Sequence, residues 1–95
     1  MLPAAPYLIV GFTVAPGTPG AEAIIAQIER DLPLPAGKFP VALPIPDTYL
    51  IQCPKNDPDT PFQDIASFLQ LQDQNLGGGL LWLVQCCRSN EIAGL

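Results

Sequence analysis

The chain has 95 residues, of which 48% are hydrophobic and 14% charged, so we expect one folded domain over residues 1–95 and no disordered protein. Nine acidic and four basic residues give a net charge of −5, and the basic residues are scattered, at Arg30, Lys38, Lys55 and Arg88. Because phosphate groups are bound by clustered positive charge, this composition disfavours nucleic acids and anionic membrane surfaces as partners.

The cysteine count and the first residues predict a cytoplasmic protein with reduced thiols. Cys53, Cys86 and Cys87 are an odd set with two adjacent members, unlike a secreted disulfide framework. Residues 1–6 contain two prolines and no basic residue, so we expect no secretory signal. No apolar run approaches the roughly 20 residues that a membrane helix needs, so we expect no membrane span.

The first predicted strand is Tyr7–Val14, which is rich in β-branched and aromatic residues and is bounded by Pro6 and Pro16. Apolar residues occupy both of its faces, which indicates a central strand buried on two sides. Gly11 lies inside it and indicates a bulge or a close approach of another backbone.

A helix is predicted to follow, with Thr18 as its N-cap, Pro19 at its first position and Pro33 ending it. Its apolar residues recur at helical spacing on one face: Ala21, Ile24, Ile25, Ile28 and Leu32. Repeated prolines after this helix favour a loop, with a short and irregular edge strand within Lys38–Ile45.

The second half of the chain repeats this alternation. Thr48–Cys53 has strong β character, and a second helix is predicted to begin with a capping box at Thr60 and Gln63. The glycines at 77–79 are expected to end that helix. Leu80–Cys87 is then a strand with apolar residues on both faces.

This element order predicts an α+β fold, a ferredoxin-like βαββαβ two-layer sandwich. Two helices are expected to cover one face of a mostly antiparallel sheet. Right-handed crossovers would place Tyr7–Val14 beside Thr48–Cys53 in the middle of that sheet.

The sequence offers no catalytic, cofactor-binding or metal-binding constellation. We therefore assign no catalytic, cofactor-binding or metal-binding residue, expect no cofactor and favour a protein that is not an enzyme. The chain has no histidine, which excludes the usual nucleophile–histidine systems. Its cysteines are expected to be buried structural thiols, although a redox or metal role stays open. Residues 56–59 suit a turn before a helix better than a calcium loop. Both glycine-rich stretches lack a phosphate-binding pattern.

One face of such a sheet would have no helices over it, and a small protein usually hides an apolar face against a partner. We therefore expect a homodimer. The aromatic residues also suit a base-stacking platform, but no basic residues surround them. The candidate interface residues are Tyr7, Ile9, Tyr49, Ile51 and Trp82.

Three short apolar segments carry a resemblance to a known family: Tyr7–Ile9, Asp47–Ile51 and Leu80–Val84. They are similar to segments of the small CRISPR-associated endoribonuclease-like proteins and their toxin relatives. The resemblance implies a ferredoxin-like fold and a homodimer. That family's metal-binding aspartate ends the first strand, whereas the corresponding stretch here, Val10–Thr13, has no carboxylate. The family's nuclease activity is therefore not implied.

The leading hypothesis is a non-enzymatic interaction or regulatory module that acts as a homodimer, with a further protein partner left open. One alternative is a small-molecule sensor whose pocket lies between the sheet and the partner subunit. The other is a divergent metal-dependent nuclease.

Overall fold

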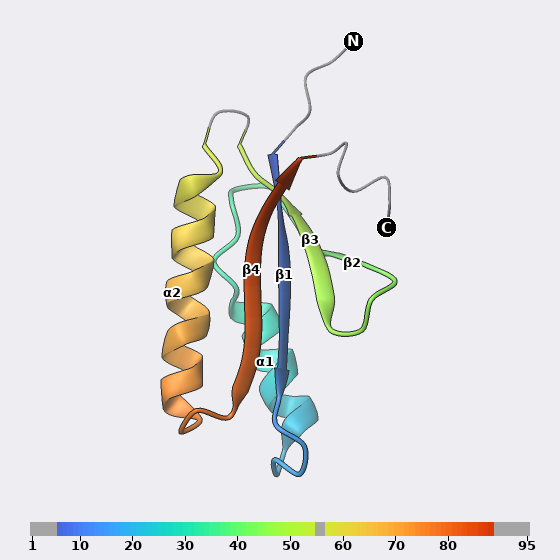
Figure 1. Ribbon diagram of the computed structural model, residues 1–95, viewed down its shortest axis with the longest axis vertical. Coiled ribbons are helices and arrows are strands. Elements are labelled where there is room, and N and C mark those ends of the chain that lie inside the picture. Colours follow the sequence, from blue (N-terminus) through green and yellow to red (C-terminus); the bar gives the residue numbers. More distant parts are fainter. Residues whose placement is uncertain (1–5, 55–56, 89–95) are drawn as a thin grey trace.

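Four strands and two helices make up the described part of the chain, residues 6–54 and 57–88 of the computed structural model (Figure 1). The helices and strands alternate in the predicted α+β order. Their bounds are β1 Pro6–Val14, α1 Ala21–Asp31, β2 Val41–Ala42, β3 Thr48–Gln52, α2 Asp59–Asn75 and β4 Leu80–Arg88.

The strands form one antiparallel sheet in the order β2-β3-β1-β4. The first strand pairs with β3 on one side and with β4 on the other, so the prediction that β1 and β3 lie together in the middle is confirmed. The β1–β4 pairing is the longest and runs from Pro6↔Arg88 to Val14↔Leu80.

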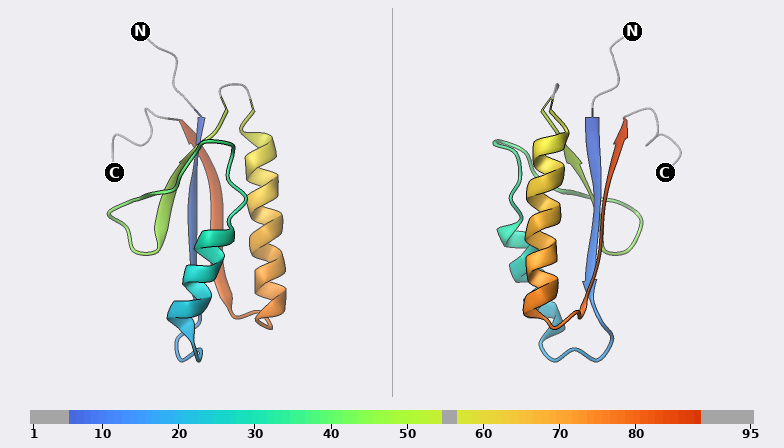
Figure 2. Two further views of the ribbon diagram at one scale, coloured as in Figure 1. Left: turned by 180° about the vertical axis from the view of Figure 1, so that it is seen from behind. Right: turned by 60° about the vertical axis from the view of Figure 1, so that its left-hand side comes forward.

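Both helices lie on the same side of the sheet, and Figure 2 shows the other side without a helix. Helix α1 packs against β1, and α2 packs along β4. The apolar core fills the space between these two layers. Its members are Leu8, Val10, Phe12, Val14, Ile28, Leu32, Ile51, Cys53, Ile65, Leu69 and Leu80.

Helix α1 begins later than the sequence predicts, because Thr18 does not cap it. The Thr18 hydroxyl donates a hydrogen bond to the Ala15 carbonyl oxygen and closes the turn after β1. Gly20 stands at the N-cap instead, with a φ of 71° that a glycine adopts without steric cost. The helix ends before Pro33, as predicted.

Helix α2 also begins differently from the predicted capping box. Thr60 lies inside the first turn, and its backbone N–H donates to Asp57 Oδ1 at 3.0 Å. Asp57 therefore caps this helix from outside it. The bond to Thr60 holds the pKa of the Asp57 carboxyl below its usual range, because a donated hydrogen bond favours the charged form.

The end of α2 follows the glycines as predicted. Gly77 and Gly78 have φ values of 63° and 87°, and their N–H groups donate to the carbonyl oxygens of Gln74 and Asp73. The Asp73 side chain continues past this turn and accepts a bond from the Leu80 N–H at 3.0 Å. One residue thus ties the helix end to the first residue of β4.

The two edges of the sheet differ in length and composition. Strand β2 has two residues and is flanked by Pro40 and Pro44, which cannot donate to a neighbouring strand. It is the short, irregular edge strand that the sequence predicts. Strand β4 has nine residues and carries no charge from Leu80 to Cys87.

Candidate interaction surface

The side of the sheet opposite the helices, here called the uncovered face, is defined by alternation along the strands. Residues directly opposite on paired strands share a face, and the core residues of β1 fix which face lies under the helices. The uncovered face therefore carries the alternate set: Tyr7, Ile9, Gly11, Thr13, Val41, Thr48, Leu50, Gln52, Leu81, Leu83, Gln85 and Cys87.

None of these twelve strand positions is charged, although the protein as a whole has a net charge of −5. Three of them expose large apolar side chains: Leu81 is 57% exposed, Leu83 53% and Val41 59%. A run of strand positions without charge, bearing half-exposed leucines, is typical of a surface that contacts another protein.

Gly11 makes a hollow in the middle of this face. It pairs with Thr48 on one side and with Leu83 on the other, so a position without a side chain lies between two with side chains. The hollow has a volume of about 310 Å³ and is open to solvent. Leu81 and Leu83 line one wall, and Pro46, Asp47 and Thr48 line the other.

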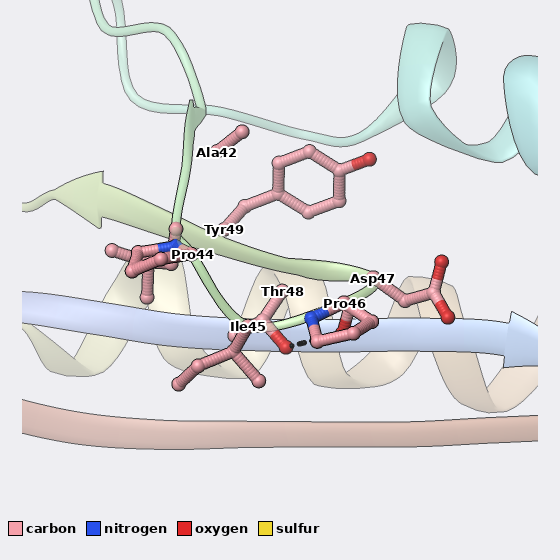
Figure 3. A pocket seen from close by; sticks show the side chains of 8 residues that line it. Ala42, Pro44, Ile45, Pro46, Asp47, Thr48 and Tyr49 are labelled. Carbon is pink, nitrogen blue, oxygen red and sulfur yellow. Dashed lines mark hydrogen bonds between the residues drawn. The ribbon is translucent and has the colours of Figure 1, made fainter. Parts of the chain in front are cut away.

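The β2–β3 loop supplies that second wall. Figure 2, right, shows it extending past β1 on the side away from the helices. Thr48 Oγ1 donates to the Pro46 carbonyl oxygen at 2.9 Å (Figure 3). The Leu43 N–H donates to the Thr48 carbonyl oxygen at 3.0 Å. Asp47 has a φ of 59°. Its prolines and these bonds restrict the conformations open to the loop.

The loop encloses a second open hollow of about 320 Å³, between Ala42 and Tyr49 (Figure 3). Its one aromatic ring belongs to Tyr49, which stacks on Phe12 with 5.6 Å between ring centroids. The Tyr49 hydroxyl donates to Glu29 Oε2 on α1 at 3.5 Å. Burial, and then the negative charge of Glu29, raise the pKa of Tyr49. Tyr49 thereby ties β3 to α1.

The structure divides the five candidate interface residues between the two sides of the sheet. Tyr7 and Ile9 lie half-buried on the uncovered face. Tyr49 and Ile51 lie under the helices, and Ile51 has no exposed surface, so it supports the sheet and is not available to a partner. Trp82 is also on the helix side but at the edge of β4, where 36% of it is exposed.

The thiols gather near one end of the sheet without forming a ligand set. Cys53 and Cys87 are buried, as expected, whereas Cys86 is exposed and departs from the prediction of buried thiols. Adjacent Cys86 and Cys87 lie on opposite faces of β4, as their positions in a strand require. Burial, and next the proximity of Cys86, raise the pKa of Cys53 to about 11, which makes it a poor nucleophile.

Acidic side chains are likewise dispersed. In residues 6–54 and 57–88 no three cysteine, aspartate or glutamate side chains lie close enough together to hold a metal ion. The stretch Val10–Thr13, where the resembled family places its aspartate, alternates between the core and the uncovered face. Phe12 is 2% exposed there, and Gly11 forms the floor of the hollow.

Sequence reasoning missed Val41, Leu81 and Leu83 as surface residues. The apolar pattern of Leu80–Cys87 did not distinguish the two faces of that strand. The pairing with β1 distinguishes them, because it aligns Leu83 with Gly11 and Trp82 with the buried Phe12. The sequence carries no local signal for this register, because both strands have apolar residues on both faces.

Comparisons of the chain with protein-family models, with curated proteins and with solved structures found no match. Neither helix of the described residues is long and apolar enough to cross a membrane.

Proposed function

We propose that this protein is a non-enzymatic interaction module that assembles as a homodimer through its uncovered face. One observation carries the proposal: Leu81 and Leu83 are more than half exposed on a sheet face whose strand positions bear no charge. Burying a large aliphatic side chain stabilises an association by about 1.5–3 kcal/mol, and these two are already half-buried. A two-fold dimer would bury four such leucines.

The absence of charge on the uncovered face favours an apolar partner surface, such as that of a second copy, over a charged partner. Two copies with a net charge of −5 repel one another wherever their acidic side chains approach. Contact through the uncovered face keeps most of those side chains apart, because its strand positions are uncharged and Asp47 is the one acidic residue among those that line the Gly11 hollow. The thiols fit a reducing cytoplasm, which we propose as the location.

The fold is proposed to be ferredoxin-like. Support comes from the alternation of elements and from the central place of β1 between β3 and β4. Kinship with the small CRISPR-associated endoribonuclease-like family is a proposal that rests on the apolar segments of the strands. Nuclease activity is not part of it, because Val10–Thr13 provides no carboxylate.

The test measures the oligomeric state by sedimentation velocity over micromolar to millimolar protein concentrations. Leu83→Glu places a charge on the uncovered face and should convert the dimer to a monomer. Leu71→Glu is the matched control, because Leu71 is 52% exposed on α2 and faces away from the proposed interface. It should leave the dimer intact.

A wild-type protein that stays monomeric throughout this range, and from which pull-down recovers no partner, would refute the proposed function. So would equal loss of the dimer in both variants, since that would place the contact elsewhere.

A further inference from the structure

Gly11 is a costly residue at its position, and nothing within the protomer requires it. A glycine inside a strand costs about 0.5–1 kcal/mol relative to alanine. Its φ does not lie in the left-handed region, and an added Cβ would meet its nearest neighbours, Asp47 O and Thr48 Oγ1, at 3.5 and 3.7 Å. These are ordinary van der Waals distances. The protomer therefore has room for a Cβ at this position, so we infer that the glycine leaves space for something outside the protomer.

The residue beside the hollow has the opposite character. Leu83 is directly opposite Gly11 on β4, and its side chain projects from the same face. A protruding leucine and an empty position therefore lie next to each other, at the same height along two neighbouring strands.

A two-fold axis that runs along the strands, midway between β1 and β4, exchanges these two positions. Rotation by 180° about that axis brings β4 of the second copy over β1 of the first. Each residue keeps its position along the strand direction. Each Leu83 then lies over the Gly11 of the other copy, and each Leu81 over the other Thr13. Both contacts form twice, as a self-complementary two-fold interface requires.

The β2–β3 loop favours the same placement. It stands over the β3 side of the uncovered face, as the walls of the Gly11 hollow show. The loop therefore obstructs a second sheet at the Thr48 end of β3, which favours an approach over β1 and β4. With the axis between those strands, each loop passes outside the β4 edge of the other copy, where Trp82 is exposed.

We propose that two copies of this chain associate by reciprocal insertion of Leu83 into the hollow over the partner's Gly11. This inference rests on the proposed homodimer and specifies its contact. The occupant of the hollow is a leucine side chain of a second copy. The dimer then has four layers, with the two sheets packed face to face in the middle and the helices of each copy outside them. Two packed sheets with nearly aligned strands are a common arrangement.

The contact is small. Two nine-residue strands, with a rise of about 3.3 Å per residue and a spacing of about 4.8 Å, form a strip of at most roughly 30 by 10 Å. Cys87, at one end of this strip, is already buried in the protomer. An interface this small lies below the roughly 1,200–2,000 Å² that stable complexes bury, so we expect a weak dimer, with a dissociation constant of micromolar or higher.

The test compares dissociation constants from sedimentation for four variants of the full chain. Leu83→Ala should weaken the dimer about tenfold, because it removes both inserted side chains. Gly11→Leu should weaken it at least as much by filling both hollows, although it adds apolar surface. Gln85→Leu is the matched control: it adds a leucine to the same face, over the partner's Ile9, and should leave the dimer unchanged or tighter.

The double variant Gly11→Leu/Leu83→Ala provides a rescue. Its new leucine on β1 faces the space left by the partner's Leu83, so the dimer should recover most of its wild-type affinity. Recovery would mark a direct contact between the two positions across the interface.

Two results separate this inference from the proposed function. If Leu83→Glu abolishes the dimer while Gly11→Leu keeps or tightens it, reciprocal insertion is wrong and the uncovered face still mediates association. If the wild-type protein is monomeric, both fail. Should Gly11→Leu not fold by circular dichroism, Gly11→Ala, whose Cβ has ordinary contacts, should give a smaller weakening in the same direction.

Discussion

Asp73 offers a quantitative test of how α2 is joined to β4. Its Oδ1 accepts a hydrogen bond at 3.0 Å from the N–H of Leu80, a residue only 4% exposed. A hydrogen bond to a charged group contributes about 1.5–3 kcal/mol to stability. Against this, a carboxylate in the last turn of a helix is unfavourable by about 0.3–1 kcal/mol, because the helix C-terminus is the negative end of its dipole.

The two effects predict different outcomes for two substitutions. Asp73→Ala removes the carboxylate that accepts the hydrogen bond from the Leu80 N–H, and it also removes the unfavourable charge at the helix end. The net free energy of unfolding should therefore fall by about 1 kcal/mol. Asp73→Asn keeps an oxygen acceptor and removes the unfavourable charge, so its stability should stay within about 0.5 kcal/mol of wild type. For a domain of this size, 1 kcal/mol corresponds to about 4–8 °C in melting temperature.

Urea unfolding followed by Trp82 fluorescence measures both variants, at one fixed protein concentration because a dimer's stability depends on it. An Asp73→Asn protein as unstable as Asp73→Ala would refute the argument, since the carboxylate charge would then matter more than the acceptor. An Asp73→Ala protein as stable as wild type would show that the Leu80 N–H finds another acceptor.

Two further predictions concern pH. The pKa of the Cys53 thiol is raised to about 11 in the folded state, so its stabilising contribution is complete below the usual thiol pKa of 9.0 and is lost as pH rises towards 11. The urea midpoint of the wild-type protein should therefore fall over this pH interval, and Cys53→Val should reduce that fall. An equal fall in both proteins would contradict the raised pKa. The pKa of Asp57 is lowered, so its contribution is present at neutral pH and is lost as pH falls through the folded-state pKa. Asp57→Ala should therefore be less stable than wild type at neutral pH, with the difference vanishing in acid; a difference that persists there would point to a role other than capping.

The sequence predicted the ends of elements better than their beginnings. Pro33 ends α1 because it has no N–H to donate, and Gly77 ends α2 because it adopts a left-handed φ. Both effects depend on the residue alone, so they can be predicted from the sequence. Thr18 and Thr60 are favourable N-cap residues, but such residues also occupy turns, and only the path of the chain decided that Thr18 bonds Ala15. Asp57 caps α2 without matching the capping-box spacing.

The candidate site depended on strand pairing, which local patterns do not encode. The residues of β4 are apolar at alternate and at intervening positions, so periodicity leaves its orientation undetermined. Its pairing with β1 places Leu83 beside Gly11 and puts the side chains of Leu81 and Leu83 on the uncovered face. The shape of the β2–β3 loop, which lines the Gly11 hollow at the Thr48 end of β3, could not be inferred from its prolines alone.

The pairing of Pro6 with Arg88 has a consequence for how this domain can be joined to other proteins. The described chain enters and leaves the fold on the neighbouring strands β1 and β4 (Figure 1), and paired strands lie about 5 Å apart. A unit with adjacent ends can be inserted into a surface loop of another protein, or circularly permuted through a short linker, without stretching either chain. In the proposed dimer the axis runs along the strands, so both pairs of ends emerge at the same end of the assembly. Two proteins fused there would be held side by side and facing the same way.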